Sequence, residues 1–344
     1  MTETTTFHVL EQHSLKAYNT FGIDAKARYF VRVQSSEDVR QALSREAFAG
    51  LPRLILGGGS NLLLTGDFPG VVIHIELMGK HIVRRDDTAT FVAAAAGENW
   101  HGFVLWSLDQ GLAGLENLSL IPGTVGASPI QNIGAYGVEL QNIFHELSAI
   151  DITSGEERVF NAAACRFGYR DSVFKQAEKN RCVITQVSFR LPHNAPLHLD
   201  YGDLRDELAR LGSQHPTARE VSAAVTSIRR RKLPDPATIG NAGSFFKNPV
   251  VERAFFNQLH RAHPAMPHYP AADGRVKLAA AWLIEQTGWK GKVLGRAGVH
   301  AQHALVLVNL GGADGAEILA LAQAIQHAVR DQFNILLEPE PTIL

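Results

Sequence analysis

The glycine-rich segment at residues 121–137 constrains the fold of this 344-residue chain more than any other stretch. It reads IPGTVGASPIQNIGAYG, in which four glycines and two prolines fall within seventeen residues. Glycine and proline at this density disfavour a continuous helix or strand, and glycine leaves backbone N–H groups uncovered by a Cβ. Such a segment suits a backbone that lies directly against a flat ligand, although a purely structural loop is the alternative.

A second glycine-rich turn, GGGSN at residues 57–61, follows the apolar strand predicted at residues 53–56. Its three glycines and the side chains of Ser60 and Asn61 offer donors that could cradle a phosphate. The turn is neither the GxGxxG of a Rossmann unit nor a Walker loop, so a plain tight turn stays open as the alternative.

Length and charge exclude several classes of protein. A chain of 344 residues corresponds to about two to three domains, and 45% hydrophobic residues are enough for full cores. Lys and Arg total 33 against 34 for Asp and Glu, so no global basic field attracts nucleic acid or an anionic membrane. Any recognition of anions must therefore be local.

Two cysteines and the N-terminal sequence bear on the compartment. Cys165 and Cys182 lack CxxC spacing, and we expect both to be buried apolar residues in a reducing environment. Residues 1–6 have neither the basic nor the apolar region of a signal peptide, and no apolar run approaches the ~20 residues that span a bilayer. We expect a soluble, cytoplasmic protein.

The pattern of residues predicts strands in the first half and clearer helices in the second. Strands are expected at residues 53–56, 71–75, 90–93 and 183–190, with a helix at 100–110. Helices are expected after the capping box of Thr217 and Glu220, after Asp314, and at residues 277–285, with a strand at 299–309. This order favours α+β domains over an alternating βαβ chain, with a boundary at residues 192–196.

Three motifs together resemble the UDP-N-acetylenolpyruvoylglucosamine reductase (MurB) family, in its tyrosine-loop branch. They are the turn at residues 57–61, the segment at 121–137 and the sequence NAGSFFKNP at 241–249. The resemblance implies an FAD-binding domain of the vanillyl-alcohol-oxidase (PCMH) type, built of two α+β subdomains, at residues 15–192. It also implies an α+β substrate-binding domain at residues 197–344, whose C-terminal end returns to the active site.

The family's activity implies two cofactors and a small-molecule partner. FAD carries hydride from NADPH to UDP-N-acetylglucosamine enolpyruvate and gives UDP-N-acetylmuramate, a peptidoglycan precursor. The resemblance implies a monomer with no nucleic-acid or membrane partner and no metal. The residues expected to hold FAD are Gly57, Gly58, Gly59, Ser60, Asn61, Ile121, Pro122, Gly123, Thr124, Gly126 and Ala127.

Three residues are candidates for the chemistry. Reduction of an enolpyruvyl double bond needs a proton donor and groups that stabilise charge on the carboxylate. By resemblance Ser244 is the proton donor, Arg170 grips the carboxylate and Glu340 is the catalytic glutamate. Taken alone, they read as a turn serine, a solvated or Asp171-paired arginine and a frayed terminal residue.

The resemblance assigns substrate binding to four further positions: Tyr201, Lys232, Asn248 and Lys277. Lys232 ends a run of four basic residues, RRRK, which by itself reads as a solvated helix end. Tyr201 is expected to close over the sugar nucleotide, with an ordinary turn tyrosine as the alternative.

Two places depart from the family pattern. The chain ends PTIL after Glu340, where the family continues with Val-Arg, and proline cannot donate to a ladder. Residues 300–303 read HAQH where the branch tends to carry two glutamines, so the contact of Gln302 or His303 with the diphosphate is open. Two other functions also stay open: a flavin oxidase of the same FAD fold, and a non-catalytic UDP-sugar sensor.

Overall fold

The computed structural model describes residues 8–344, so the N-terminal residues that bear on a signal peptide lie outside the described part. Packing divides the chain into two compact units. Unit 1 contains residues 8–13, 27–59 and 68–231, and unit 2 contains residues 14–26, 60–67 and 232–344. The predicted domain boundary at residues 192–197 stays a prediction, since the units divide by packing at Arg231 and Lys232.

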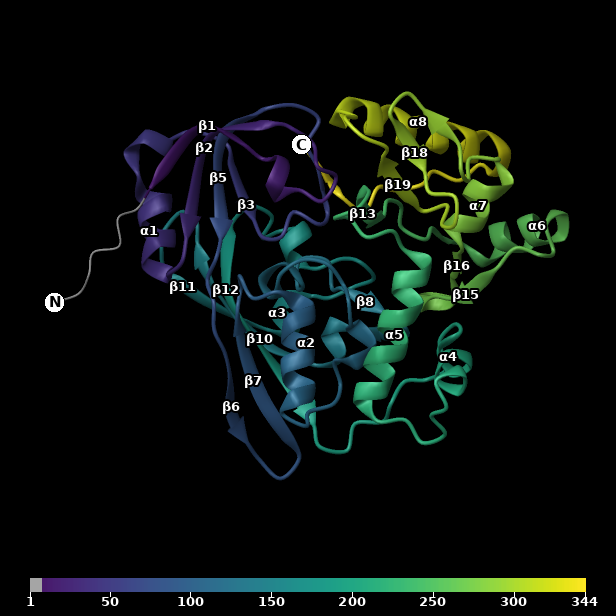
Figure 1. Cartoon of the computed structure of the whole chain (residues 1–344), viewed down its shortest axis with the longest axis horizontal. Helices are drawn as coiled ribbons and strands as arrows, with labels where there is room; N and C mark the ends of the chain where they lie inside the picture. Colours follow the sequence, from purple (N-terminus) through teal and green to yellow (C-terminus); the bar gives the residue numbers. More distant parts are fainter. Residues whose placement is uncertain (1–7) are drawn as a thin grey trace. The chain divides into compact units, whose positions relative to one another are not determined.

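The first sheet of unit 1 has the strand order β1-β2-β5-β3. Its strands β2, β5 and β3 are parallel, and α1 covers one face through Val39, Ala42 and Leu43 (Figure 1). The bounds are β1 Val9–Ser14, β2 Lys26–Val33, α1 Ser36–Ser44, β3 Arg53–Leu56 and β5 Phe68–Ile75. The central position and burial of β5 explain the continuous apolar run that predicted it, whereas β3 lies at the sheet edge and is mostly half-buried.

The second sheet of unit 1 is antiparallel, in the order β11-β10-β12-β7-β6. Helix α2 lies along it (Figure 1), and the Phe103 ring packs against the Phe189 ring with centroids 5.0 Å apart. The bounds are β6 Lys80–Arg85, β7 Ala89–Ala95, α2 Trp100–Asp109, β10 Phe144–Asp151, β11 Glu157–Asn161, α3 Ala162–Cys165 and β12 Cys182–Pro192. The predicted strands at 90–93 and 183–190 and the helix at 100–110 are confirmed.

Smaller elements complete unit 1. They are β8 Gly134–Ala135, β9 Val138–Glu139, α4 Leu204–Arg210 and α5 Ala218–Lys232. Helices α4 and α5 share an apolar cluster that Tyr136 joins. The prediction for the cysteines is half right: Cys165 is buried, whereas Cys182 is half-buried beside the Arg158 guanidinium, 3.4 Å away.

Unit 2 contains a four-stranded sheet, β13-β19-β18-β17, and a three-stranded sheet, β14-β16-β15. Strand β20 adds a parallel pair with β4. The bounds are β4 Leu62–Leu63, β13 Gly240–Ser244, β14 Val250–Val251, α6 Arg253–Ala262, β15 His268–Pro270, β16 Val276–Leu278, α7 Ala280–Gln286, β17 Val293–Leu294, β18 Ala297–Val299, β19 Val306–Asn309, α8 Gly315–Phe333 and β20 Thr342–Ile343.

Two predictions in unit 2 are wrong in part. The helix expected from Lys277 begins only at Ala280, because Lys277 and Leu278 pair with neighbouring strands. The strand expected at residues 299–309 is broken by a turn in which His303 N donates to His300 O. In the first case pairing with neighbouring strands outweighs local periodicity, and in the second a local turn separates two short strands. None of the helices in the described residues has the length and apolarity to cross a bilayer.

Both predicted helix starts are confirmed. Thr217 and Glu220 exchange hydrogen bonds at the start of α5, with Thr217 N 2.7 Å from Glu220 Oε2. Asp314 accepts from Glu317 N at 2.9 Å, and Glu317 accepts in turn from Asp314 N at 3.1 Å. These pairs satisfy N–H groups that the first turn of a helix otherwise leaves without a partner.

We expect Asp314→Ala to lower the free energy of unfolding by about 1 kcal/mol, because it removes the side-chain half of this capping box. Urea denaturation measures the change. Asp331→Ala, at an exposed position near the other end of α8, is the matched control and should change stability by less than about 0.5 kcal/mol. Equal effects of the two substitutions would contradict the capping role.

Candidate active site

The two glycine loops of unit 1 meet at backbone distance. A Cβ on Gly57 would lie 2.5 Å from Thr124 Oγ1, and one on Gly58 would lie 3.0 Å from Gly123 Cα. No side chain fits between the loops, so glycine is required at both positions. Gly59 and Gly123 have φ values of +59° and +114°, in the region that glycine adopts without strain.

The second loop is fixed to the end of β7. Gly126 N donates to Ala96 O at 2.9 Å, and Val125 N donates to Glu98 O at 2.8 Å. A Cβ on Gly126 would lie 2.5 Å from Ala96 Cβ, so this contact also depends on glycine. The loop therefore cannot shift without breaking hydrogen bonds to the sheet.

The outer edges of these loops are open to solvent. Gly58, Pro122 and Ala127 are exposed, whereas Val125 and Gly59 are buried. The result is a surface lined by backbone and small side chains, which lets a phosphate approach N–H groups closely. The residues therefore fit the diphosphate of FAD, and Ile121, which packs partly on the core beneath, anchors the start of the loop.

Arg170 lies in a strained part of unit 1. Its φ is +54°, and its Nη2 donates to Gly134 O at 2.7 Å. The neighbouring Asp171 accepts from Ser172 N and Gln176 Nε2, at 2.9 and 3.1 Å. A non-glycine residue at positive φ is uncommon and is often found at functional sites.

Arg229 is a candidate site residue that the sequence interpretation missed. Burial lowers the pKa of its guanidinium, with opposing contributions from Tyr136 and Arg170. Its Nε donates to Leu120 O at 3.3 Å, directly before the second glycine loop. The half-buried guanidiniums of Arg170 and Arg229 thus lie near each other and favour an anionic ligand.

Two tyrosines adjoin this cationic cluster. Burial raises the pKa of Tyr136, with smaller contributions from Arg229, which lowers it, and from Asp203 and Tyr201, which raise it. The exposed Tyr201 ring stands edge-on to Tyr136 with centroids 6.2 Å apart. Tyr201 also packs on Gly137, where a Cβ would lie 3.6 Å from that of Tyr201. Tyr201 therefore lies against the end of the glycine-rich segment at residues 121–137, and its closure over the sugar nucleotide stays a prediction.

In unit 2, Ser244 and Glu340 lie on adjacent segments. Ser244 ends β13, and the next residue but one, Phe246, pairs with Pro339. Glu340 N donates to Phe245 O at 2.8 Å, and Asn61 Nδ2 donates to Glu340 O at 3.2 Å. Glu340 is therefore held on both sides and is not a frayed terminal residue.

The short C-terminus is also fixed in place. Thr342 N donates to Asn61 O at 3.0 Å, Leu344 N to Leu63 O at 2.9 Å, and Thr65 N to Leu344 O at 2.7 Å. The proline before them is buried and donates nothing, so the pairing with β4 begins one residue later. The departure from the family ending does not loosen this segment.

The substrate-binding candidates of unit 2 lie on separate segments of the chain. Asn248 Oδ1 accepts from Ala280 N at 2.9 Å, at the start of α7. Lys277 pairs with Val250 in β16, and its Nζ lies 5.9 Å from the Tyr269 ring. Lys232, at the end of α5, contributes to lowering the pKa of His303, after burial and His300.

Two imidazoles in the sequence HAQH, at residues 300–303, each have one ring nitrogen without a hydrogen-bond partner. The Nδ1 atoms of His300 and His303 are both buried without a hydrogen bond. In residues 8–344, no group of three or more His, Cys, Asp and Glu side chains is arranged to hold a metal ion.

Comparison with known proteins bears on this arrangement. A family profile for an FAD binding domain matches residues 27–161, and one for the UDP-N-acetylenolpyruvoylglucosamine reductase C-terminal domain matches residues 235–344. The chain is 55% identical over 339 residues to the UDP-N-acetylenolpyruvoylglucosamine reductase of Burkholderia multivorans, covering 98% of this chain and 97% of that one. It is 56% identical to that of Pseudomonas aeruginosa, covering 97% and 98%. The chain belongs to the UDP-N-acetylenolpyruvoylglucosamine reductase family.

Among solved structures, the chain is similar to a UDP-N-acetylenolpyruvylglucosamine reductase from Thermus caldophilus. The TM-score is 0.65 at 23% identity, covering 98% of both chains. At that identity the likeness supports the fold alone. The predicted family, the predicted α+β fold class and the predicted FAD-binding domain are confirmed.

We expect Gly57→Ala to abolish tight FAD binding, because the added methyl collides with Thr124 Oγ1 and separates the two loops. Visible absorbance per mole of purified protein measures the retained flavin. Gly66→Ala is the matched control, since a Cβ there meets nothing within 4 Å. A Gly57→Ala protein with full flavin content would contradict the close approach.

We expect removal of residues 342–344 to lower the free energy of unfolding by roughly 2–4 kcal/mol, since three backbone hydrogen bonds to residues 61–65 are lost. Urea denaturation measures the change. Thr342→Ala keeps the backbone bonds and alters an exposed side chain, so it should have little effect. An unchanged stability after truncation would show that this pairing contributes nothing.

Proposed function

We propose that this chain reduces UDP-N-acetylglucosamine enolpyruvate to UDP-N-acetylmuramate with electrons from NADPH. The observation that carries the proposal is an identity of 54–56% to named reductases over nearly the full length of both chains. The FAD binding domain and the reductase C-terminal domain match separate parts of the same chain. A flavin oxidase would not account for the second match.

The glycine loops are proposed to hold FAD by its diphosphate. The contacts that support this role are the Cβ-free approach of Gly57 and Gly58 to the second loop and the exposed edges of both. Bound FAD supplies the hydride chemistry, accepting hydride from NADPH and delivering it to the terminal carbon of the enolpyruvyl group. The protein's own residues bind, orient and protonate the substrate.

Arg170 is proposed to bind the substrate carboxylate. Its guanidinium donates to Gly134 O, and the neighbouring half-buried Arg229 adds a second positive charge. A carboxylate in this environment gains more from each charge than it would in water, because the surroundings are poorly screened. Negative charge that develops on the carboxylate during reduction is stabilised in the same way.

Ser244 is proposed to donate the proton to the carbon next to the one that receives hydride. A hydroxyl is a weak acid and needs hydrogen-bonding neighbours to donate well. The adjoining Glu340 segment, tied to Phe245 O at 2.8 Å, places a carboxylate-bearing residue next to the serine strand. We propose that Glu340 acts with Ser244, and that Tyr201, Lys232, Asn248 and Lys277 bind the UDP-sugar. The proposed enzyme is a cytoplasmic monomer.

The test of the whole proposal is spectroscopic. Purified protein should be yellow, and it should oxidise NADPH only when the enolpyruvyl substrate is supplied. Rapid reoxidation of the reduced flavin by oxygen, with no use of NADPH, would favour a flavin oxidase. Calorimetry that shows UDP-sugar binding without turnover would favour a sensor. A protein that cannot take up FAD would overturn the proposal.

We expect Ser244→Ala to slow reoxidation of the reduced flavin by substrate by roughly 10²–10⁴-fold, the range for loss of a general acid. Reduction of the flavin by NADPH should stay within about twofold of the unmodified enzyme, because that step needs no proton from Ser244. Stopped-flow absorbance separates the two half-reactions. Equal slowing of both would mean that the substitution disturbs the flavin site itself.

A further inference from the structure

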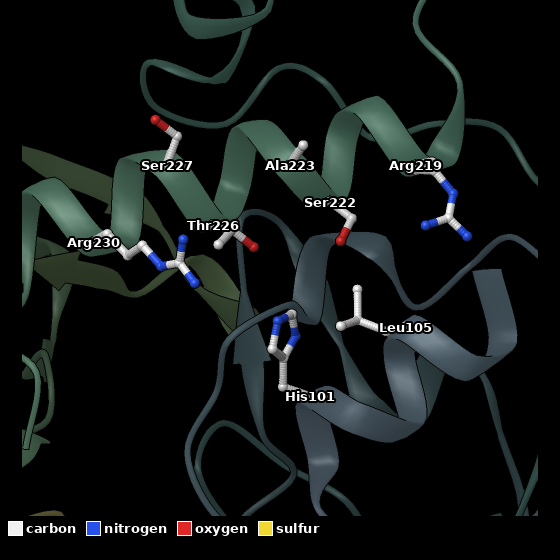
Figure 2. A pocket seen from close by; sticks show the side chains of 8 residues that line it. All are labelled: His101, Leu105, Arg219, Ser222, Ala223, Thr226, Ser227 and Arg230. Atoms are coloured by element: carbon white, nitrogen blue, oxygen red, sulfur yellow. The ribbon is translucent and has the colours of Figure 1, made fainter. Parts of the chain in front are cut away.

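A groove of about 430 Å³ lies between α2 and α5 in unit 1, apart from the glycine loops and the Arg170 cluster. Its lining residues are His101, Leu105, Arg219, Ser222, Ala223, Thr226, Ser227 and Arg230 (Figure 2). Ligand pockets for small molecules typically span about 300–1,000 Å³. The groove is therefore large enough for a compact metabolite.

Three hydrogen-bond donors lie close together at one end of the groove, on Arg230, Thr226 and His101. Figure 2 shows the Arg230 and Thr226 side chains reaching from α5 towards the His101 ring on α2. His101 Nδ1 accepts from Leu120 N at 3.0 Å, which leaves Nε2 as the N–H of the neutral ring. This end thus presents a guanidinium, an imidazole N–H and a hydroxyl.

The charge at this end is uncompensated. Arg230 is exposed, and within residues 8–344 its guanidinium makes no ion pair or hydrogen bond. No carboxylate is among the residues that line the groove. Arg230 and Arg229 both act to lower the pKa of His101, after burial, so the local potential is positive. Donors and positive charge without a counter-ion suit an oxyanion with several acceptor atoms.

The middle of the groove is apolar and its far end is neutralised. Leu105 keeps 39% of its surface exposed and lies opposite Ser222 of α5 in Figure 2, and Ala223 lines the groove from the same helix. Arg219 lies eleven residues before Arg230, about 16 Å along the helix, and pairs with Asp109. An occupant therefore needs one anionic end and an apolar body.

We propose that this groove binds a phosphorylated small molecule, with the phosphoryl group on Arg230, His101 and Thr226 and an apolar body against Leu105 and Ala223. The proposal is independent of the reaction proposed above. Leu120 connects the groove to the cluster of Arg170 and Arg229, because its N–H donates to His101 Nδ1 and its carbonyl accepts from Arg229 Nε.

Calorimetry of the FAD-loaded protein tests the proposal with two probes, inorganic phosphate and phenyl phosphate. Saturating UDP is present throughout, so that sites recognising the substrate's diphosphate are filled. Both probes should bind saturably, and phenyl phosphate should bind roughly tenfold more tightly, because its ring is buried against Leu105.

Substitutions locate the binding. Arg230→Gln should weaken both probes at least about tenfold, and Thr226→Val should weaken them by a smaller factor. Arg219→Gln is the matched control on the same helix. Its charge is paired with Asp109 and lies about 16 Å along the helix from Arg230. At physiological salt, exposed charges more than about 8–10 Å apart interact little, so phosphate binding should change less than twofold.

Three results would overturn the proposal: no saturable binding of either probe, equal affinities for the two probes, or an affinity that Arg230→Gln leaves unchanged. Circular dichroism and flavin content of each variant show that it is folded and loaded. The readout is heat of binding and not turnover. Failure of the groove proposal is therefore distinguishable from failure of the proposed reductase reaction.

Discussion

The close approach of two backbones between the glycine loops is the contact on which the rest of the site depends. Gly58 and Gly123 lie so near each other that a Cβ on the first would meet the Cα of the second at 3.0 Å. The first loop continues β3, and the second is bonded to the end of β7. Their contact therefore joins the parallel and antiparallel sheets of unit 1 at the place where phosphate would bind.

Positive charge in this protein is local and does not show in its net charge. The chain carries 33 basic and 34 acidic residues, so its overall field is weak. Two half-buried guanidiniums near Tyr136, of Arg170 and Arg229, nevertheless create a positive neighbourhood, because partial burial limits their screening by water. The backbone N–H groups of the glycine loops, which we propose as the FAD diphosphate site, would bind an anion without any charged side chain.

Sequence patterns predicted most elements whose determinants are local. The capping boxes at Thr217 and Asp314 identify the starts of α5 and α8 because each is made by residues three apart. The strand at residues 299–309 was wrong in part because a turn interrupts it at His300, and the helix at 277–285 because its first residues join a sheet. In the second case the pairing of Lys277 and Leu278 with neighbouring strands decides the structure, and local periodicity does not show that pairing.

The candidate site likewise has residues that the sequence predicted and one that it did not. The glycine motifs and the positions of Ser244, Arg170 and Glu340 could be named from the chain alone, because they occur in short, distinctive sequences. Arg229 could not be separated from the rest of the run RRRK by its sequence. Helical rotation of about 100° per residue turns Arg229 towards Tyr136 and Arg230 towards His101, which is a property of packed helices.

By itself the sequence determined the family and the two glycine motifs, and it supplied the residues proposed for the chemistry. Only the tertiary structure decided that Gly57 must lack a side chain because of Thr124, and that the terminal residues pair with β4. It also decided which residue of the basic run lies near Tyr136 and which lines the groove between α2 and α5. The physical reason is that each of these features arises from contacts between segments distant in sequence, whose energies no local pattern encodes.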